Sequence, residues 1–575
     1  MRKVRGIAAS PGIAIGPAFR FERATLQVER HTVDDPEAEW ARLEAALKAA
    51  HIQLEEIYAK AATESGAETA AVFEAQAMML EDPELLDTLR SAIIEQHQNA
   101  EAALVDASEA YAQALEALDD EYLRARAADV RDVATRVLRE LLGVAESPTA
   151  ELVTPSIILA RDLTPSDTAL LDKALVLGFC IAEGGATSHT AILARGLGLP
   201  AVVGAGPDVL AIPNGTSLIL DGSEGTLIVE PSPETITAYQ ARRTALTDVM
   251  AEAQSHAAEP AVTLDGHRVE VVANIGNVEG AHAAVANGAE GVGLLRTEFL
   301  YLERDHLPDE EEQFEAYRAI ADVFGTRPVI LRTLDVGGDK ELPSLTLPKE
   351  MNPFLGLRAI RLSLARPDLF RPQLRAALRA AAGHNLKLMF PMVATAQEIR
   401  EARAILEACR AELSAEGLAT PEQLDVGIMV EIPSAAIMAD QLAEEVDFFS
   451  IGTNDLTQYT MAADRTNPAV SYLVSGLQPA VLRLIKMVID AAHAHGKWVG
   501  MCGELAGEPL AIPILLGLGL DEFSMNPPAI PIAKQIIRSL SLVEAQTIAA
   551  RALALDTPEA IQELVRSEVD ALANL

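Results

Sequence analysis

The sequence predicts an α/β multidomain protein whose C-terminal half forms a (β/α)8 TIM barrel. Three observations indicate this class. Strand-like runs alternate with helical patterns toward the C-terminus, an acidic helical segment interrupts a β/α region near the N-terminus, and aromatic residues make up only 4% of the chain. A length of 575 residues allows about three or four domains, and an apolar share of 49% allows sizeable cores.

The predicted barrel spans residues 261–575 and contains eight short strand-like runs. Helical patterns separate most of them, and eight β/α alternations in succession are typical of a closed barrel. An open doubly wound sheet is the alternative fold. The eight predicted strands are Val269–Ile275, Gly291–Arg296, Val329–Asp335, Lys387–Val393, Gly427–Ile432, Phe448–Asn454, Trp498–Glu504 and Glu522–Asn526.

Residues 1–22 and 148–230 are predicted to form one β/α domain that is interrupted by a helical insertion over residues 23–147. In the insertion, glycine is rare and apolar residues recur at helical spacing, with breaks expected at Ser65-Gly66, Pro83 and Asn99. Residues 231–260 are predicted to form a linker helix to the barrel. Strands of the β/α domain are expected at Ser156–Ala160, Ala174–Phe179 and Thr216–Leu220.

The formal net charge of −38 disfavours nucleic acid and anionic lipid as partners. Cys180, Cys409 and Cys502 are too widely spaced for a disulfide framework or a Cys-x-x-Cys metal site. The N-terminus does not resemble a signal peptide, and the apolar run Leu510–Leu520 is too short to span a bilayer. We therefore expect a cytoplasmic protein without membrane insertion.

Polar residues close several of the predicted barrel strands. Active sites of (β/α)8 barrels lie at the carboxyl ends of the strands. Charged residues at the ends of apolar strands are costly unless they face a cleft or pair with one another. The sequence therefore predicts a functional site formed by the residues at or just after these strand ends, which include Asn274, Arg296, Arg332, Glu431, Asn454, Asp455, Cys502 and Glu504.

Four arginines near these strand ends, Arg296, Arg332, Arg358 and Arg465, are candidates to bind a small, multiply anionic substrate. A guanidinium group binds phosphate or carboxylate with two parallel hydrogen bonds, although structural salt bridges are the alternative. Glu431 and Asp455 provide hard oxygen ligands of the kind that Mg2+ prefers, and strand-end caps are the alternative.

Cys502 lies between these groups in Gly500-Met501-Cys502-Gly503-Glu504. A lone cysteine is usually an inert apolar filler. Beside arginines, which are expected to lower its pKa, it could instead donate or accept a proton.

His189 lies outside the barrel, in Gly184-Gly185-Ala186-Thr187-Ser188-His189-Thr190, just before a predicted helix. Thr187 or Ser188 is a natural helix N-cap, and backbone N–H groups at a helix N-terminus stabilise added negative charge. His189 is therefore a candidate to carry a phosphoryl group, with an ordinary surface histidine as the alternative. Thr168 is a candidate hydrogen-bonding partner.

Several segments together resemble Enzyme I of the bacterial phosphotransferase system, the phosphoenolpyruvate–protein phosphotransferase family. The resemblance runs nearly from end to end of the chain. The segments are Gly6–Gly12, Leu80–Pro83, Asp129–Val133, Gly184–Thr190, Gly293–Phe299, Asp335–Lys340, Asp447–Tyr459 and Gly500–Glu504.

The resemblance implies that His189, on a swivelling β/α domain, accepts the phosphoryl group of phosphoenolpyruvate. It implies that Cys502 protonates the resulting enolate to give pyruvate. It further implies a substrate site, a metal site and two protein partners: phosphoenolpyruvate bound by Arg296, Arg332, Asn454, Asp455 and Arg465, Mg2+ held by Glu431 and Asp455, the carrier protein HPr docked on the helical insertion, and a second copy of the chain bound through the barrel.

Two other functions share parts of this pattern. A dikinase has the same swivelling domain and barrel, but it would need an additional ATP-binding domain. A non-enzymatic scaffold is disfavoured because the acidic, arginine and cysteine residues are all present. The sequence departs from the family at Ala186, where arginine is common, at Ile432 and Ser434, and in residues 471–479 and 526–528.

Overall fold

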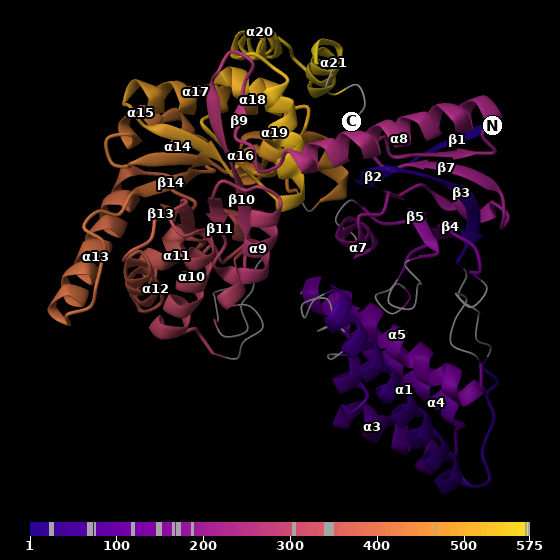
Figure 1. Ribbon diagram of the computed structural model, residues 1–575. Coiled ribbons are helices and arrows are strands. Elements are labelled where there is room, and N and C mark those ends of the chain that lie inside the picture. Colours follow the sequence, from indigo (N-terminus) through magenta and orange to yellow (C-terminus); the bar gives the residue numbers. More distant parts are fainter. Residues whose placement is uncertain are drawn as a thin grey trace. The chain divides into compact units, whose positions relative to one another are not determined.

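The computed structural model divides into two compact units, Met1–Arg243 and Thr244–Leu575. The helices and strands of the two units are labelled in Figure 1. The structure describes residues 1–21, 28–65, 73, 76–116, 121–144, 152–163, 167, 174–185, 189–301, 306–338, 345, 350–465, 467–569 and 572.

The second unit is a closed eight-stranded parallel barrel. Its strands follow one another around the barrel in chain order, and β10 pairs with both β17 and β11, which closes the sheet. A short ninth strand, β9 (Ala261–Val262), runs antiparallel to β10. The barrel strands are β10 (Arg268–Ile275), β11 (Val292–Leu295), β12 (Val329–Arg332), β13 (Leu386–Phe390), β14 (Val426–Val430), β15 (Phe448–Ile451), β16 (Trp498–Met501) and β17 (Glu522–Met525).

The predicted (β/α)8 barrel is thus confirmed and the open sheet is wrong, because the first barrel strand, β10, pairs with the last, β17, and an open sheet in chain order would leave these two strands apart. Each predicted strand is present, but most end earlier than predicted. Asp335, Asn454 and Glu504 follow their strands instead of closing them. The apolar pattern continues past the last residue of each strand because the turns at the mouth of the barrel are themselves buried.

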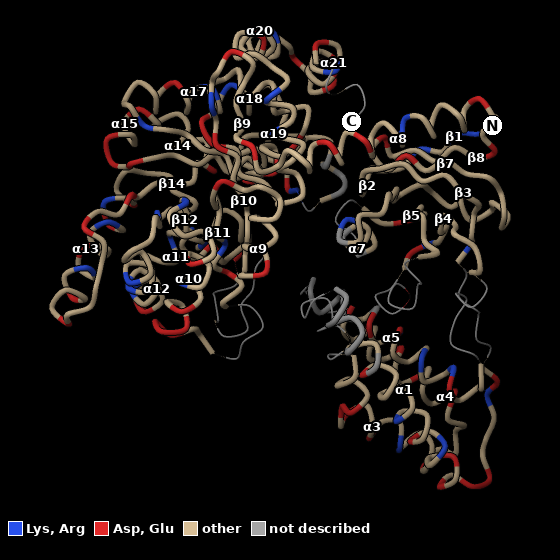
Figure 2. Tube along the Cα trace, in the orientation of Figure 1, with Lys and Arg blue, Asp and Glu red and all other residues tan. Residues whose placement is uncertain are grey.

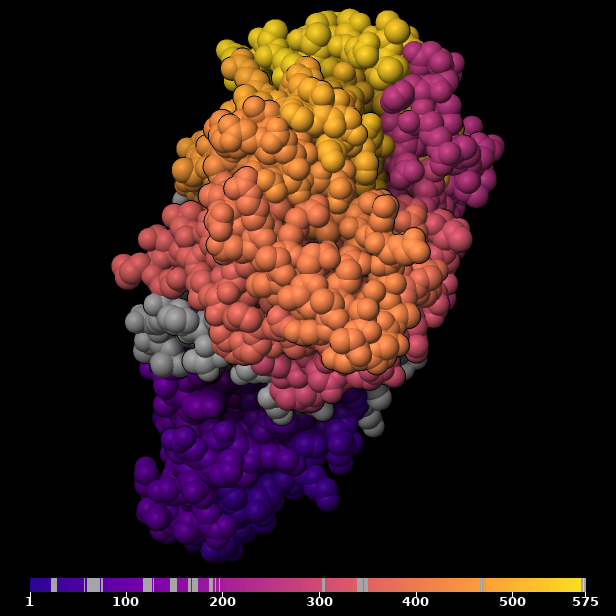
Figure 3. Space-filling view, turned by 90° about the vertical axis from the view of Figure 1, so that its left-hand side faces the viewer, coloured from indigo at the N-terminus to yellow at the C-terminus, as the bar shows by residue number. Residues whose placement is uncertain are grey.

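Helices cover the outside of the barrel, and in Figure 3 the residues of this unit form a continuous side-chain surface on the face turned to the viewer. Apolar residues of the strands and helices form one large core between the two layers. The helices are α9 (Val278–Ala286), α10 (Glu310–Phe324), α11 (Ile360–Ala365), α12 (Pro367–Ala380), α13 (Ala396–Ala415), α14 (Pro433–Ile437), α15 (Ala439–Leu442), α16 (Thr453–Met461), α17 (Pro479–Ala494), α18 (Ile512–Leu518), α19 (Ile530–Arg538), α20 (Leu542–Ala552) and α21 (Pro558–Glu568).

Glycines in three strands make room for large side chains inside the barrel. A Cβ atom on Gly427 would lie 2.5 Å from the Phe448 ring, and one on Gly500 would lie 2.7 Å from Oε1 of Glu522. A Cβ on Gly293 would lie 2.5 Å from Oγ of Ser524. The barrel interior is therefore filled by side chains of alternate strands, as expected for this fold.

The first unit contains an eight-stranded mixed sheet of order β1-β8-β7-β3-β4-β5-β6-β2. The three strands predicted after the helical insertion are confirmed as β4, β5 and β7, each within two residues of the predicted bounds at either end. The strands are β1 (Arg2–Arg5), β2 (Ile7–Ser10), β3 (Ile13–Arg20), β4 (Ser156–Ala160), β5 (Val176–Ile181), β6 (Ala201–Val203), β7 (Ser217–Asp221) and β8 (Thr226–Val229), with α7 (His189–Leu197) between β5 and β6.

The helical insertion lies between β3 and β4, which are parallel neighbours in this sheet. Two predicted breaks are confirmed, since α3 begins at Pro83 and α4 at Ala100, whereas the residues after the break predicted at Ser65-Gly66 lie outside the described ones. Apolar residues at helical spacing, such as Leu43, Leu47 and Leu54, form its core. The helices are α1 (Pro36–Ser65), α3 (Pro83–Arg90), the π-helix η1 (Ser91–Glu95), α4 (Ala100–Glu116) and α5 (Glu121–Leu142).

The predicted linker is the helix α8 (Pro233–Ser255), and the boundary between the two units falls inside it. Its N-terminal part belongs to the first unit, where Arg242 Nη1 lies 2.7 Å from Oδ2 of the buried Asp221. The chain just after the helix is held in the second unit, where Lys534 Nζ donates to the carbonyl oxygens of Ala257 and Glu259 at 3.0 Å. Among the helices that the structure describes, none has the length and hydropathy needed to cross a bilayer.

Candidate active site

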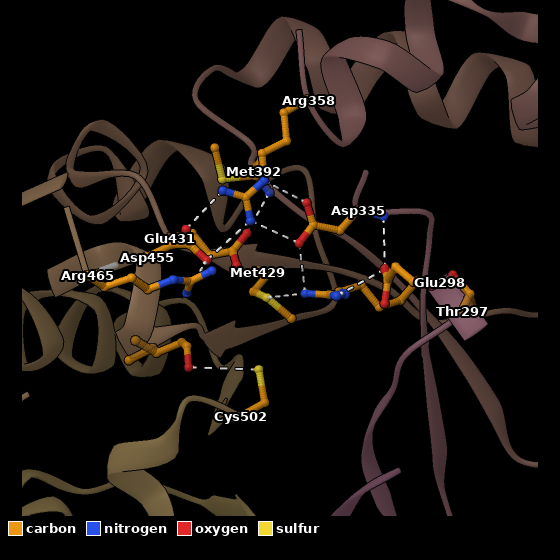
Figure 4. A network of polar contacts seen from close by, with 12 residues as sticks. Thr297, Glu298, Asp335, Arg358, Met392, Met429, Glu431, Asp455, Arg465 and Cys502 are labelled. Carbon is orange, nitrogen blue, oxygen red and sulfur yellow. Dashed lines mark hydrogen bonds and ion pairs between the residues drawn. The ribbon is translucent and has the colours of Figure 1, made fainter. Parts of the chain in front are cut away.

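A row of alternating charges lies at the carboxyl ends of the barrel strands (Figure 4). Arg332, the last residue of β12, pairs with Glu298 Oε1 at 3.0 Å and with Asp335 Oδ2 at 3.2 Å. Arg358 binds both oxygens of Asp335, at 2.9 and 3.1 Å, and both oxygens of Asp455, at 2.9 and 3.3 Å. Because each interior arginine lies between two carboxylates, the charges are compensated although the row is buried.

Arg465 extends the row toward solvent. Its Nη1 lies 3.6 Å from Asp455 Oδ2, and its side chain is one-quarter exposed. Arg332 is buried, and its Nε atom has no hydrogen-bond partner among the residues that the structure describes. A buried guanidinium N–H without an acceptor is unfavourable. This side of Arg332 is therefore suited to an anionic oxygen supplied by a ligand.

Arg358 behaves differently from the other candidate arginines. It is 1% exposed, and its guanidinium group is occupied by two carboxylates. The turn at Gly337 and Gly338 is packed tightly against it, since a Cβ on Gly337 would lie 3.0 Å from the Arg358 Cα atom. Both glycines have positive φ angles, 111° and 76°. The structural salt bridge, given above as the alternative, describes Arg358 better than direct ligand binding.

Glu431 follows β14 and is buried beside this row. Its Oε2 accepts the backbone N–H of Met392 at 2.8 Å, and Met392 has a φ of 58°, which is unusual outside glycine. Gly452 leaves the necessary space, because a Cβ there would lie 2.7 Å from Glu431 Cγ. Burial, and then repulsion from Asp455 and Asp335, raises the pKa of Glu431 to about 8.

Glu431 and Asp455 fit a hard divalent cation. Both are buried carboxylates, and their repulsion is the kind that a bound Mg2+ would relieve. In the described ranges no group of three or more His, Cys, Asp or Glu residues is placed to hold a metal ion. Substrate oxygens and water would therefore have to complete the coordination of the ion.

Cys502 follows β16 and is buried, with its Sγ 3.9 Å from the carbonyl oxygen of Ile451 (Figure 4). Arg332 lowers the pKa of Cys502 as expected, but the expected net lowering of this pKa is wrong. Burial raises the pKa of the Cys502 thiol to about 12, and the opposing effect of Arg332 is smaller. The group is a protonated thiol at neutral pH, which makes it a proton donor and not a ready nucleophile.

Asn454 and Asn274 hold the loops around Cys502. The Oδ1 of Asn454 accepts the backbone N–H of Glu504 at 3.0 Å, and the Nδ2 of Asn274 donates to the Cys502 carbonyl oxygen at 3.0 Å. Arg296 follows β11, but its side chain is exposed and outside the charged row. Its role in substrate binding stays a prediction.

Sequence reasoning missed Glu298 and Asp335 as members of the site. Glu298 also accepts the backbone N–H of Asp335 at 3.0 Å, so these two acids position each other as well as Arg332. Each of these acids lies within three residues of a strand-end arginine, Glu298 after Arg296 and Asp335 after Arg332. This spacing could have indicated both as members of the site.

His189 is the first described residue of α7 in the first unit, which confirms the helix predicted after it. The preceding turn contains Gly184 with a φ of 85°, a conformation that favours glycine. Arg195 Nη1 donates to the Ala9 carbonyl oxygen at 2.8 Å and so attaches α7 to the sheet. Four residues discussed from the sequence lie outside the described ones. They are the candidate hydrogen-bonding partner Thr168, the candidate caps Thr187 and Ser188, and Ala186, where arginine is common in the family.

Three family models match successive parts of the chain. They are the N-terminal, mobile and PEP-binding domains of PEP-utilising enzymes, matching residues 5–126, 152–225 and 250–542. Over 98% of its length, the chain is 51% identical to the phosphoenolpyruvate-protein phosphotransferase of Priestia megaterium, 52% to that of Geobacillus stearothermophilus and 50% to that of Bacillus subtilis. These matches cover 98–99% of each relative. The chain therefore belongs to the phosphoenolpyruvate-protein phosphotransferase family of PEP-utilising enzymes.

Proposed function

We propose that this protein transfers the phosphoryl group of phosphoenolpyruvate to His189 and then to a histidine of the carrier protein HPr, releasing pyruvate. This is the first step of a phosphoenolpyruvate-dependent sugar phosphotransferase system. The observation that carries the proposal is the barrel mouth, where the row from Glu298 to Arg465 lies beside a buried acid, Glu431, and a protonated thiol, Cys502. Membership of the family supports the same assignment.

Substrate binding is assigned to Arg332 and Arg465, with Arg296, Asn454 and Asp455 as further predicted contacts. The phosphate and carboxylate of phosphoenolpyruvate are both anionic, and guanidinium groups bind both in a planar, two-pronged manner. The buried Nε of Arg332, which lacks an acceptor in the described structure, would gain one. Transfer of a phosphoryl group depends mainly on such positioning and charge stabilisation.

Glu431 and Asp455 are proposed to hold Mg2+. When bound there, the ion would help neutralise the charge on the substrate's phosphoryl oxygens. Asp455 also binds Arg358, so its carboxylate is held in place before any ion arrives. Arg358 and Asp335 thus act as positioning residues for the predicted metal ligand.

Cys502 is proposed to complete the reaction as the acid. Loss of the phosphoryl group leaves the enolate of pyruvate, whose C3 carbon takes the proton from Sγ of Cys502. A thiol with a pKa of about 12 retains its proton until a strong base is formed beside it. The same burial that makes Cys502 a poor nucleophile therefore suits it to this step.

The reaction requires a moving carrier. His189 belongs to one compact unit and the charged row to the other, and the chain passes between them within α8. Residues 231–260 are the proposed hinge segment. Because Arg242 attaches α8 to the first unit and Lys534 holds Ala257 in the second, bending is expected between these anchors.

The helical insertion is the proposed docking site for HPr. A groove of about 830 Å³ lies between α3, η1 and α4, and its lining includes Glu84, Asp87 and Asp106. Figure 2 shows further acidic residues, in red, along these helices. A groove of this charge would attract a partner with a basic surface.

We also propose that the protein forms a homodimer through the barrel and acts in the cytoplasm. Met351, Leu355 and Tyr472 expose large apolar side chains on two loops of the barrel unit. A surface patch of such side chains is typical of protein contacts, and the proposal takes these three to belong to one. Light scattering of the wild type and of a Met351→Glu/Leu355→Glu variant would test this part of the proposal.

The transfer itself is tested with phosphoenolpyruvate labelled in its phosphoryl group. Incubation with Mg2+ should give an acid-labile, base-stable phosphoprotein, and addition of HPr should move the label to HPr. A His189→Ala variant should remain unlabelled. Labelling of this variant would overturn the assignment of His189, and labelling by ATP but not by phosphoenolpyruvate would favour a dikinase.

A further inference from the structure

The side chain of Ser450, in β15, is buried in the barrel and has no assigned role. The residue is fully buried, and its Oγ has no hydrogen-bond partner in the part of the chain that the structure describes. Buried hydroxyl groups are nearly always hydrogen-bonded, since an unpaired one loses its hydration without compensation. An exception beside a reacting group suggests that the hydroxyl has a partner in another state of the reaction.

The strand register places Ser450 close to Cys502. Ser450 is paired with Gly500 across β15 and β16, and side chains of alternate residues point to the same face. Phe448 and Trp498, two residues before this pair, stack inside the barrel with ring centroids 4.6 Å apart. Ser450 and Cys502 therefore also face the interior, and Gly500 has no side chain to separate them.

A contact of the Cys502 sulfur supports the same placement. The Sγ of Cys502 lies 3.9 Å from the carbonyl oxygen of Ile451, the residue after Ser450 (Figure 4). The Ser450 hydroxyl lowers the pKa of Cys502 by hydrogen bonding to its ionised form, although burial outweighs this effect. The hydroxyl is thus within reach of the sulfur without being used by the neutral thiol.

We propose that Ser450 is a positioning residue whose hydroxyl donates a hydrogen bond to the Cys502 thiolate formed when the enolate is protonated. This proposal rests on the proposed function. In that step the Sγ–H bond breaks and its proton forms a C–H bond at C3 of the enolate, giving pyruvate. The electron pair stays on Sγ, and solvent returns the proton before the next turnover.

The other groups around the sulfur explain why a neutral donor is needed. Arg332 favours the thiolate, whereas Glu431 and Glu522 oppose it and burial opposes it most. Arg332 is already shared between Glu298 and Asp335. The Ser450 hydroxyl has no partner while Cys502 is a neutral thiol, and it gains one when the thiolate forms. This contact stabilises the thiolate and not the thiol, so it lowers the barrier to protonation of the enolate.

The test uses the full chain and the reverse step, removal of a proton from C3 of pyruvate. Wild type, Ser450→Ala and Ser450→Thr are incubated with pyruvate and Mg2+ in D2O, and loss of the methyl proton signal is followed by NMR. Ser450→Ala should exchange about tenfold more slowly, because a hydrogen bond to a charged group is lost. Ser450→Thr keeps the hydroxyl and should stay within about threefold of the wild type.

A second measurement separates this role from a defect in packing. Ser450→Ala should form phosphohistidine from phosphoenolpyruvate at a rate within about threefold of the wild type, because the hydroxyl acts after phosphoryl transfer. Ser156→Ala, which removes another buried serine hydroxyl in the other unit, is the matched control and should leave exchange unchanged.

The outcomes are distinguishable. Exchange by Ser450→Ala at the wild-type rate would overturn the proposal, and so would an equal loss in the alanine and threonine variants or a parallel loss of phosphohistidine formation. If instead the wild type itself forms no phosphohistidine from phosphoenolpyruvate, the proposed function fails first.

Discussion

The two ends of the barrel each contain a buried glutamate whose pKa is raised to about 8, yet their surroundings differ. At the mouth, Glu431 lies near two arginines and two other carboxylates. At the base, Glu522 Oε1 and the Trp498 ring both lie beside Gly500, and Lys387 is the only cation that acts on the pKa of Glu522 in the described structure. Glu431 therefore belongs to a cluster of charges to which a cation could be added, whereas Glu522 is a protonated, uncharged residue of the barrel core.

This difference shows that a raised pKa does not identify a functional residue by itself. Burial is the main cause at both ends. What separates them is the arrangement of fixed donors: Glu431 accepts a backbone N–H from a strained residue, Met392, while Oε1 of Glu522 has no partner in the described ranges. A positioned acid with unmet charge is a better candidate for function than an isolated one.

The largest expected effect is at the mouth, in Arg332→Ala. This change removes a predicted substrate contact and leaves Glu298 without its cation. We expect phosphohistidine formation to fall at least about 100-fold and the barrel to lose about 3 kcal/mol of unfolding free energy. Rapid-quench labelling and denaturant unfolding would measure the two effects.

The matched control is Arg400→Ala, which removes an exposed arginine paired with Glu445. It should change the unfolding free energy by less than about 1 kcal/mol and leave labelling unchanged. If Arg332→Ala and Arg400→Ala lost similar amounts of labelling rate and unfolding free energy, the mouth of the barrel would not differ from its outer surface in this respect.

The next effect is expected in Cys502→Ala. Pyruvate formation should fall about 100-fold or more, because the proton donor is lost, while binding of phosphoenolpyruvate should be largely retained. Steady-state turnover together with direct binding measurements would show this. Loss of binding instead would indicate that Cys502 has a structural role.

A smaller effect is expected at the base, in Glu522→Gln. The carboxyl has its ordinary pKa in the unfolded chain but a pKa of about 8 in the folded barrel, so the folded state binds the proton more tightly. Stability of the wild type should therefore fall as pH rises from about 5 to 8, by about 1.4 kcal/mol per unit at most.

The amide of Glu522→Gln cannot ionise, so the variant should lack this pH dependence and exceed the wild type in stability near pH 8. Chemical unfolding at several pH values would test it. Parallel curves for the two proteins would contradict the assignment of a neutral Glu522.

The smallest effect is expected in Lys387→Met. Lys387 Nζ lies 5.7 Å from the centroid of the Trp498 ring, pairs with Asp425 and lowers the pKa of Glu522. Its loss should cost about 1 kcal/mol and move the pH-dependent loss of stability to higher pH. The same unfolding series measures it, and an unchanged pH profile would show that Lys387 does not act on Glu522.

The periodicity of the sequence was enough to predict the barrel, the helical insertion and the linker helix, because alternation and helical spacing are local properties. It was also enough to place Arg332, Glu431 and Cys502 at the carboxyl ends of strands. The periodicity was less accurate at strand ends. Buried turns there, such as the one containing Met392, continue the apolar pattern after the β-strand pairing has ended.

By itself, then, the sequence determined which residue types close the strands, and so the kind of chemistry available. Only the tertiary structure decided how they act on one another. Glu298 and Asp335 share Arg332 across two strands, Arg358 is saturated by two acids, and the thiol of Cys502 is made a weak acid by burial. The physical reason is that desolvation and Coulomb interaction depend on distances through the folded barrel, which neighbours in sequence do not reveal.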